Sequence, residues 1–243
     1  MPMTVAAQAQ ASAAATSGRR ARTSAEAARY SILRRLAPAL KHDMVVNLQA
    51  VAMMAEVLNA RLEKGSPAAS DFEGSISKMN RLAREAVMTC LRVAAWIEPA
   101  EDESIRLREG VEECVSLLRS SLNFRGFSVE NEVAETEFEV SRVAMRNLLA
   151  ASLIALTDSA QQSCTLVVGA EVASGFAVLS LRCLPSQEEA DAPVADPVYR
   201  ELDWADVQAL AVAEGVELFR TQDQIVMRIP RMLTSGPLQI APL

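Results

Sequence analysis

Apolar side chains recur at alternating steps of three and four residues along two long stretches of this sequence. The first stretch, residues 24–64, carries Leu33, Ala37, Leu40, Met44, Leu48, Val51, Ala55, Leu58 and Leu62. The second, residues 70–98, carries Phe72, Ile76, Met79, Ala83, Ala86, Cys90, Val93 and Ile97. Each series lasts for about four heptads, so we predict two long amphipathic helices. The segment EKGSPAASD between them predicts a turn, and hence an antiparallel helical hairpin.

A single hairpin cannot bury an apolar surface this wide. Leu82, Val87, Leu91 and Trp96 lie beside the apolar series of the second helix. A second copy of the hairpin would cover them in a four-helix bundle, so we expect a homodimer. Pro38 lies inside the first predicted helix and is expected to bend or interrupt it.

The rest of the chain has a different pattern. We expect a linker over 99–104 and a mixture of helices and strands over 105–232, including a β-hairpin in CTLVVGAEVASGFAVLSLRCL. This mixture predicts an α/β sandwich, with helices on one face of a mixed sheet. The whole chain is thus α+β: a helical hairpin domain over 24–98, then the α/β domain. Residues 1–23 are rich in Ala and Ser and predict a disordered tail, and 233–243 form a C-terminal tail.

Composition excludes several classes of function. The net charge of −7 argues against nucleic-acid binding, because no broad basic surface is available to meet phosphates. The four cysteines are scattered and only one histidine is present, so we expect buried reduced thiols and no zinc site. No apolar run approaches the roughly 18–20 residues that span a bilayer, and the N-terminal residues do not have the pattern of an export signal. These features predict a cytoplasmic protein that does not enter a membrane.

His42 is the only histidine in the sequence, and it lies on the first predicted helix. Successive residues of a helix are rotated by about 100°, which places His42 opposite the apolar series and in solvent. The surrounding exposed strip predicts a docking surface for a partner. We assign Arg35, Lys41, Val45, Val46, Gln49 and Met53 to that surface. Alternatively, the second domain or a partner subunit covers the strip and His42 has no role.

An exposed histidine can capture a phosphoryl group on a ring nitrogen with few helper groups. The reaction needs an unprotonated nitrogen and an acceptor for the other N–H. Asp43 is adjacent in sequence and is our candidate for orienting the ring and taking its proton. Lys41 and Arg35 would attract the incoming phosphate.

The sequence HDMVVNLQ, which begins at His42, resembles the H-box of bacterial sensor histidine kinases. In those proteins this box lies on the first helix of a dimerising hairpin. The resemblance implies that His42 is the phosphoacceptor and Asp43 is the adjacent acid. Val46 occupies the position where that family usually carries Asn or Thr to position a water for dephosphorylation.

Residues 100–232 resemble the ATP-binding domain of the same kinases in the order of their elements. RNLLAASLIAL is similar to the helix NLLxNAxxA, whose second Asn binds magnesium, but Ala151 occupies that position here. Where the family carries a glycine-rich DxGxG segment, this chain reads LPSQEEADAPVADP. The comparison implies a degenerate ATPase-like domain, and we expect neither bound ATP nor a resident metal.

A dimeric phosphoacceptor hairpin followed by a degenerate ATPase-like domain resembles the histidine phosphotransferases of bacterial phosphorelays. This resemblance implies that His42 passes phosphoryl groups between aspartates of response-regulator receiver domains, without intrinsic ATP-dependent kinase activity. The magnesium would then come with the receiver. Two alternatives stay open: a kinase-like dimer that only binds or sequesters partners, and a divergent active kinase. Function retained after His42→Ala would favour the first alternative, and measurable magnesium–ATP binding would favour the second.

Overall fold

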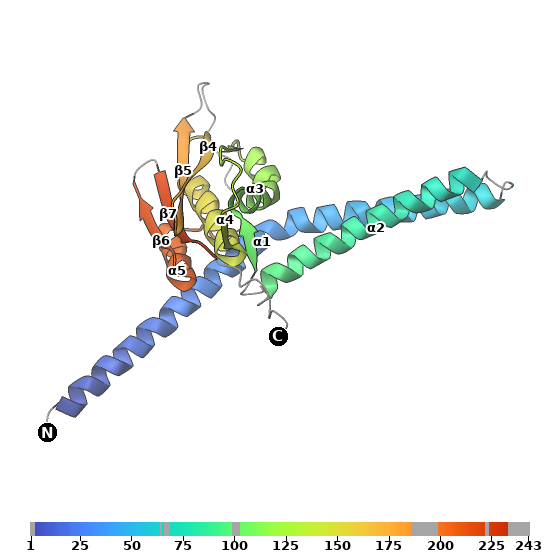
Figure 1. Cartoon of the computed structure of the whole chain (residues 1–243). Helices are drawn as coiled ribbons and strands as arrows, with labels where there is room; N and C mark the ends of the chain where they lie inside the picture. The colour runs from blue at the N-terminus through green and yellow to red at the C-terminus, as the bar shows by residue number, and fades with distance from the viewer. Residues whose placement is uncertain are drawn as a thin grey trace, which may run out of the picture. The chain divides into compact units, whose positions relative to one another are not determined.

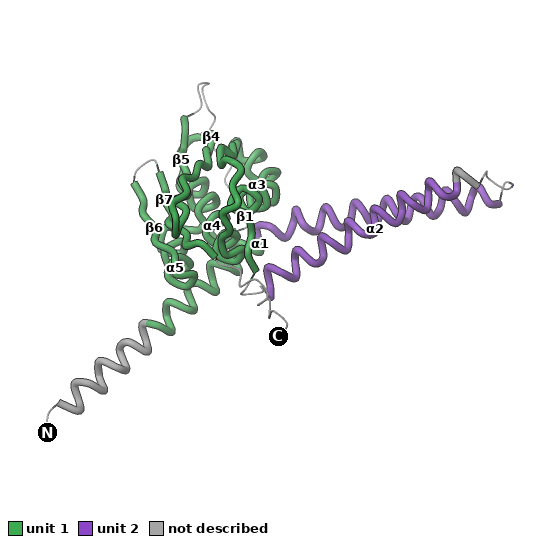
Figure 2. The backbone as a smooth tube through the Cα atoms, viewed as in Figure 1, with its two compact units in different colours: residues 1–34, 101–243 green, residues 35–100 purple. Residues whose placement is uncertain are grey.

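Two long helices and a mixed β-sheet with helices make up the chain, as a computed structural model shows (Figure 1). The structure describes residues 3–63, 65, 69–98, 103–185, 199–221 and 224–232, with side chains from residue 18 onward except 69–71. The chain divides into two units (Figure 2). One unit is residues 35–100, the hairpin unit, and the other comprises residues 1–34 and 101–243, the α/β unit. Residues 186–197 of the segment LPSQEEADAPVADP and the predicted C-terminal tail, 233–243, lie outside the described residues.

The hairpin unit contains residues 35–63 of α1 (Met3–Glu63) and all of α2 (Ala69–Ile97). Leu58, Ala86 and Thr89 are buried in it. The Cys90 Sγ lies 3.2 Å from the Met44 Sδ, so the two helices lie side by side at this level. The predicted helical hairpin is therefore confirmed.

The first helix differs from the prediction at its N-terminal end. It begins at Met3, so residues 3–23 are helical where we expected a disordered tail. It also continues through Pro38 without the predicted interruption. Its residues up to Arg34 belong to the α/β unit, which moves the unit boundary from residue 24 to residue 35.

Besides the N-terminal part of α1, the α/β unit contains three helices and seven strands among the residues that the structure describes. In chain order they are β1 (Ser104–Arg106), α3 (Leu107–Phe124), β2 (Ser128–Asn131), β3 (Glu139–Ser141), α4 (Arg142–Ser159), β4 (Cys164–Val172), β5 (Phe176–Pro185), α5 (Trp204–Glu214), β6 (Glu217–Arg220) and β7 (Gln224–Pro230). Five strands form one sheet in the order β2-β4-β5-β7-β6, and β1 pairs with β3. Only β2 is parallel to its neighbour, β4, so the sheet is mixed as predicted.

One face of the five-stranded sheet forms the core of this unit. Along β5, Leu179 and Leu181 are fully buried whereas Ser180 and Arg182 on the opposite face are not. Helix α4 is buried along most of its length and packs between α3 and α5. This burial explains why its sequence is almost continuously apolar, because a helix covered on all sides needs no polar face.

The N-terminal part of α1 packs against the α/β unit. Ala25, Ala28 and Ile32 are almost completely buried, and their spacing places them on one side of the helix. Arg29 Nη2 donates a hydrogen bond to Glu214 Oε1 at the end of α5, 2.9 Å away. Burial alone would lower the pKa of Arg29, but hydrogen bonds and charge attraction from Glu214 and Glu26 outweigh burial and raise it. This stretch of the predicted first helix therefore belongs to the α/β unit and not to the hairpin unit.

Two of the four cysteines form a disulfide, which corrects the prediction of reduced thiols. Cys164 and Cys183 lie on the paired strands β4 and β5, with Cα atoms 6.1 Å apart. Cys114 is buried as expected, and burial raises the pKa of its thiol. Cys90 is exposed.

We expect reductant to destabilise the α/β unit. The disulfide closes a loop of 19 residues, and a cross-link of this kind contributes about 3 kcal/mol by restricting the unfolded chain. Thermal melting followed by circular dichroism should give a midpoint about 6 to 12 °C lower in dithiothreitol. The Cys183→Ser variant should melt at the lower temperature with or without dithiothreitol. Equal midpoints for the wild type in both conditions would show that the bond does not form.

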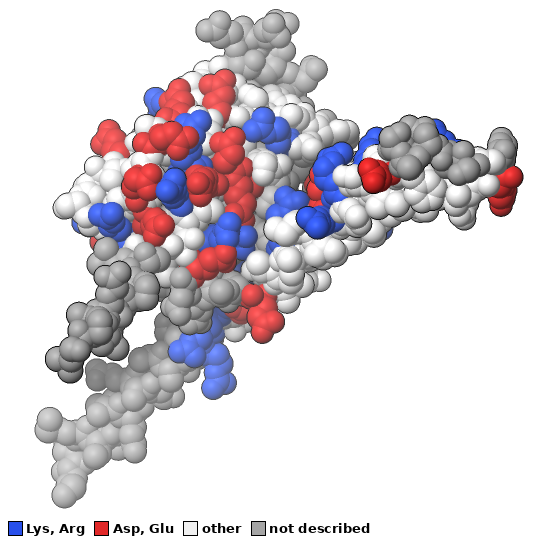
Figure 3. All heavy atoms as spheres, turned by 45° about the vertical axis from the view of Figure 1, so that its right-hand side comes forward, with Lys and Arg blue, Asp and Glu red and all other residues white. Residues whose placement is uncertain are grey.

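Among the described residues, no helix combines the length and apolar character needed to cross a membrane. On the face of the α/β unit shown in Figure 3, acidic and basic side chains are interspersed, and the described part of that face has no broad basic area.

Candidate functional site

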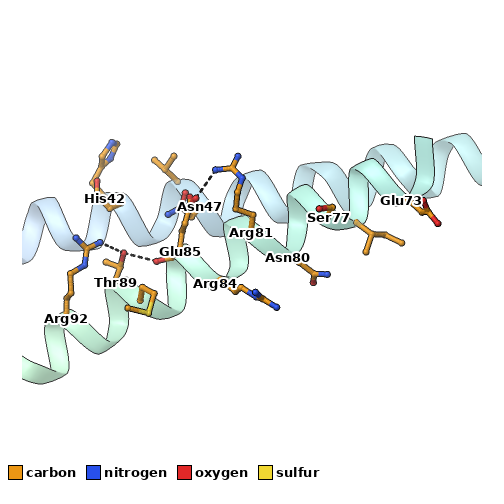
Figure 4. Close-up of a pocket in the computed structure, with 14 residues that line it drawn as sticks. His42, Asn47, Glu73, Ser77, Asn80, Arg81, Arg84, Glu85, Thr89 and Arg92 are labelled. Atoms are coloured by element: carbon orange, nitrogen blue, oxygen red, sulfur yellow. Dashed lines mark hydrogen bonds and ion pairs between the residues drawn. The ribbon is translucent and has the colours of Figure 1, made fainter. Parts of the chain in front are cut away.

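A groove with a volume of about 920 Å³ runs along the hairpin unit between α1 and α2 (Figure 4). Its α1 wall consists of His42, Asp43, Val46 and Asn47. Its α2 wall is longer and includes Arg81, Arg84, Glu85, Met88, Thr89 and Arg92. The sole histidine of the chain is thus an element of a concave surface.

The side chains that we assigned to the phosphoacceptor and its docking surface divide into two groups. His42, Asp43 and Val46 are exposed and line the groove. Lys41, Gln49 and Met53 are exposed, and Val45 is half-buried, but none of these four lines the groove.

Arg35 does not fit the predicted docking surface. Only 8% of it is exposed, so it is buried and not available to attract a phosphate. The prediction used helical rotation alone, which places Arg35 near the side of His42 but gives no information on what covers that side.

His42 and Asp43 form no hydrogen bond or ion pair with any described residue, including each other. The imidazole nitrogens are therefore free to meet a partner. The orienting role of Asp43 stays a prediction, because catalytic hydrogen bonds often form only in the reactive complex.

The α2 wall contains polar contacts that sequence reasoning missed. Arg92 Nη2 donates a hydrogen bond to Thr89 Oγ1 over 2.9 Å, and the Thr89 hydroxyl donates to the Glu85 carbonyl over 3.0 Å. Arg81 Nη1 forms an ion pair with Glu85 Oε1 at 2.8 Å. The sequence predicts which residues share a face of each helix. It does not give the register between the two helices, which decides which α2 residues lie at the level of His42.

Helix α4 carries Ala151 at the position where the resemblance to histidine kinases implies a magnesium-binding Asn. Ala151 is completely buried and has no ligand atom in its side chain. Asn147, one turn earlier, donates its amide N–H to Glu214 Oε1 over 2.7 Å, and the same oxygen accepts from Arg29. Among the described residues, no group of three His, Cys, Asp or Glu side chains could hold a metal ion.

No protein-family model matches this sequence, and no curated protein matches it either. Several solved structures resemble it. The Acinetobacter baumannii histidine kinase AdeS is 14% identical, with 79% of this chain and 98% of that chain covered and a TM-score of 0.40. A histidine kinase from Burkholderia phymatum is 12% identical, with coverage of 80% and 98% and a TM-score of 0.40. A bacterial phosphotransferase is 18% identical, with coverage of 82% and 95% and a TM-score of 0.34.

Two of these structures are histidine kinases and one is a phosphotransferase.

Proposed function

We propose that this chain is a histidine phosphotransfer protein of a bacterial two-component phosphorelay. In this proposal His42 carries a phosphoryl group from the aspartate of one receiver domain to that of another. The observation that carries the proposal is the position of His42: it is the sole imidazole, exposed in a groove, beside a carboxylate, with no side chain among the described residues holding its ring nitrogens.

The reaction that we infer is an in-line displacement at phosphorus. The lone pair of an unprotonated His42 nitrogen forms the N–P bond while the P–O bond to the receiver aspartate breaks. The aspartate carboxylate leaves with the electron pair of that bond. The proton on the other ring nitrogen passes to Asp43 and then to water. The reverse sequence delivers the phosphoryl group to the second receiver.

The proposed reaction requires no nucleotide in this chain. The donor is already an acyl phosphate, and the receiver supplies the magnesium. The filling of the α4 region by Ala151 and by the Asn147–Glu214–Arg29 hydrogen bonds supports this part of the proposal.

We assign receiver docking to the groove and to the exposed strip beside it. Val46 and Met53 are 46% and 61% exposed and therefore offer apolar surface to a partner. Val45, Lys41 and Gln49 complete the strip, and Arg35 is no longer included.

The hairpin is proposed to pair with a second copy through exposed apolar side chains that do not line the groove. Leu48, Val87 and Leu91 are between 49% and 57% exposed in the single chain. Leu48, Val87 and Leu91 do not line the groove, and helical rotation places Leu48 well away from His42. Covering them would join two hairpins into a four-helix bundle and leave both His42 side chains accessible.

A two-receiver relay tests the proposal. A panel of receiver domains would be phosphorylated with acetyl phosphate and magnesium, freed of donor, and mixed with this chain and a second, unphosphorylated receiver. We expect phosphate to reach the second receiver only when this chain is present. No transfer from any member of a panel shown to be phosphorylated would reject the phosphorelay role and favour the non-catalytic interaction protein.

A further inference from the structure

Arg92 of α2 lies at the level of His42 of α1. The contact between Met44 and Cys90 fixes the register of the two antiparallel helices. His42 precedes Met44 by two residues and Arg92 follows Cys90 by two, so the equal helical rise places them at the same height. Both line the groove, and Figure 4 shows them at the same end of it.

The Arg92 side chain is held in place by a buried partner. Its guanidinium donates to Thr89 Oγ1 at 2.9 Å, and Thr89 is only 1% exposed. The hydroxyl of Thr89 is fixed in turn by its bond to the Glu85 carbonyl. A half-buried cation on a fixed support loses little rotational freedom when it binds an anion.

The charge of Arg92 has no counter-ion among the residues that the structure describes. Arg81, in the same groove, differs because Glu85 neutralises it. Arg84 lies eight residues away from Arg92 along α2, or about 12 Å along the helix axis. Arg92 is therefore the groove arginine that has no counter-ion among the described residues and also lies at the level of His42.

We propose that Arg92 is a catalytic residue that binds the phosphoryl oxygens as the group moves between a receiver aspartate and His42, and that Thr89 is its positioning residue. This inference rests on the proposed phosphotransfer function. Negative charge in the transferring group is spread over its three equatorial oxygens, and a guanidinium presents paired N–H donors that match two of them. The bonds made and broken are those of the transfer already described, and Arg92 neither gains nor loses a proton.

A small phosphodonor tests Arg92 without the contribution of receiver docking. With phosphoramidate, the N–P bond to His42 forms while the P–N bond of the donor breaks and ammonia leaves. We expect Arg92→Ala to slow the appearance of phosphohistidine by about 10- to 50-fold, because a charge-assisted bond to the moving group is lost. Arg92→Lys should recover part of this loss. Lys78→Ala, which removes an exposed cation of α2 outside the groove, is the control and should stay within about twofold of the wild type.

Thr89→Val removes the hydroxyl that holds Arg92 and keeps a side chain of nearly the same shape. It should slow phosphohistidine formation several-fold, and the double variant Thr89→Val/Arg92→Ala should be no slower than Arg92→Ala alone, since both changes act through one guanidinium. Circular dichroism and sedimentation of every variant confirm that the fold and assembly are kept, and Arg92→Gln serves as a second variant if Arg92→Ala unfolds.

Three results would overturn the inference. Equal rates for wild type and Arg92→Ala with phosphoramidate would show that Arg92 does not act on the phosphoryl group. Slower transfer from a phosphorylated receiver with unchanged phosphoramidate rates would make Arg92 a docking residue. No phosphohistidine on the wild type with either donor would reject the proposed function itself, and this inference with it.

Discussion

The His42→Gln variant will accept no phosphoryl group from any receiver domain that phosphorylates the wild type. Glutamine has a similar size and keeps hydrogen-bonding groups, but its amide nitrogen has no lone pair able to form a stable N–P bond. Because His42 is exposed, the substitution should leave the stability of the hairpin within about 0.5 kcal/mol of the wild type. Intact-mass spectrometry after incubation with the phosphorylated panel measures the result directly.

Asn59→Ala is the control for this experiment. It changes an exposed residue of α1 outside the groove and the docking strip and removes no nucleophile, so the variant should still carry phosphate. Wild-type amounts of phosphate on His42→Gln would place the acceptor elsewhere and contradict the role of the imidazole.

The double variant Val87→Asp/Leu91→Asp will convert the proposed dimer into a monomer. Two chains would place four carboxylates in an interface that the proposed bundle fills with apolar side chains, and each unpaired charge costs several kcal/mol to bury. The dissociation constant of the dimer should rise by at least about 1000-fold, or about 4 kcal/mol. Analytical ultracentrifugation over a range of protein concentrations measures this constant.

Met53→Asp is the control for assembly. Met53 is 61% exposed, close to the 57% of Val87, but it lies on the His42 side of the hairpin. This variant should remain a dimer while losing affinity for receivers. A wild-type chain that sediments as a monomer at high concentration, or a double variant that stays dimeric, would contradict the proposed bundle.

The hairpin was predictable from sequence because its apolar series is long and periodic. Four heptads on each helix leave few alternatives to two packed helices. The α/β unit was predictable in outline for a similar reason, since its strands and helices have distinct patterns. The packing of α1 against that unit was not predicted. Ala25, Ala28 and Ile32 lie in the predicted first helix, but the sequence does not show that the α/β unit covers them.

The α1 wall of the groove could be predicted from the sequence, but its α2 wall could not. The only histidine and the acid next to it could be selected from the sequence. Arg92 and Thr89 could not, because their position near His42 depends on the helix register that the contact between Met44 and Cys90 establishes. Burial of Arg35 also depends on packing that helical rotation does not give.

One contact that was not predicted could have been recognised from the sequence. Cys164 and Cys183 lie at opposite ends of one predicted β-hairpin, and pairing its strands around the Ser-Gly turn would have brought them close together. The buried ion pair between Arg125 and Asp158, 3.0 Å long, joins residues 33 positions apart by tertiary packing and has no such signal.

The identity of the phosphodonor tests the central claim most directly. Purified wild-type chain would be incubated either with magnesium–ATP alone or with the panel of phosphorylated receiver domains, and acid-labile phosphate on the chain would be measured in each case. We predict phosphate on His42 from at least one receiver and none from magnesium–ATP. Labelling from magnesium–ATP alone would show that the α/β unit is an active kinase domain and contradict this account.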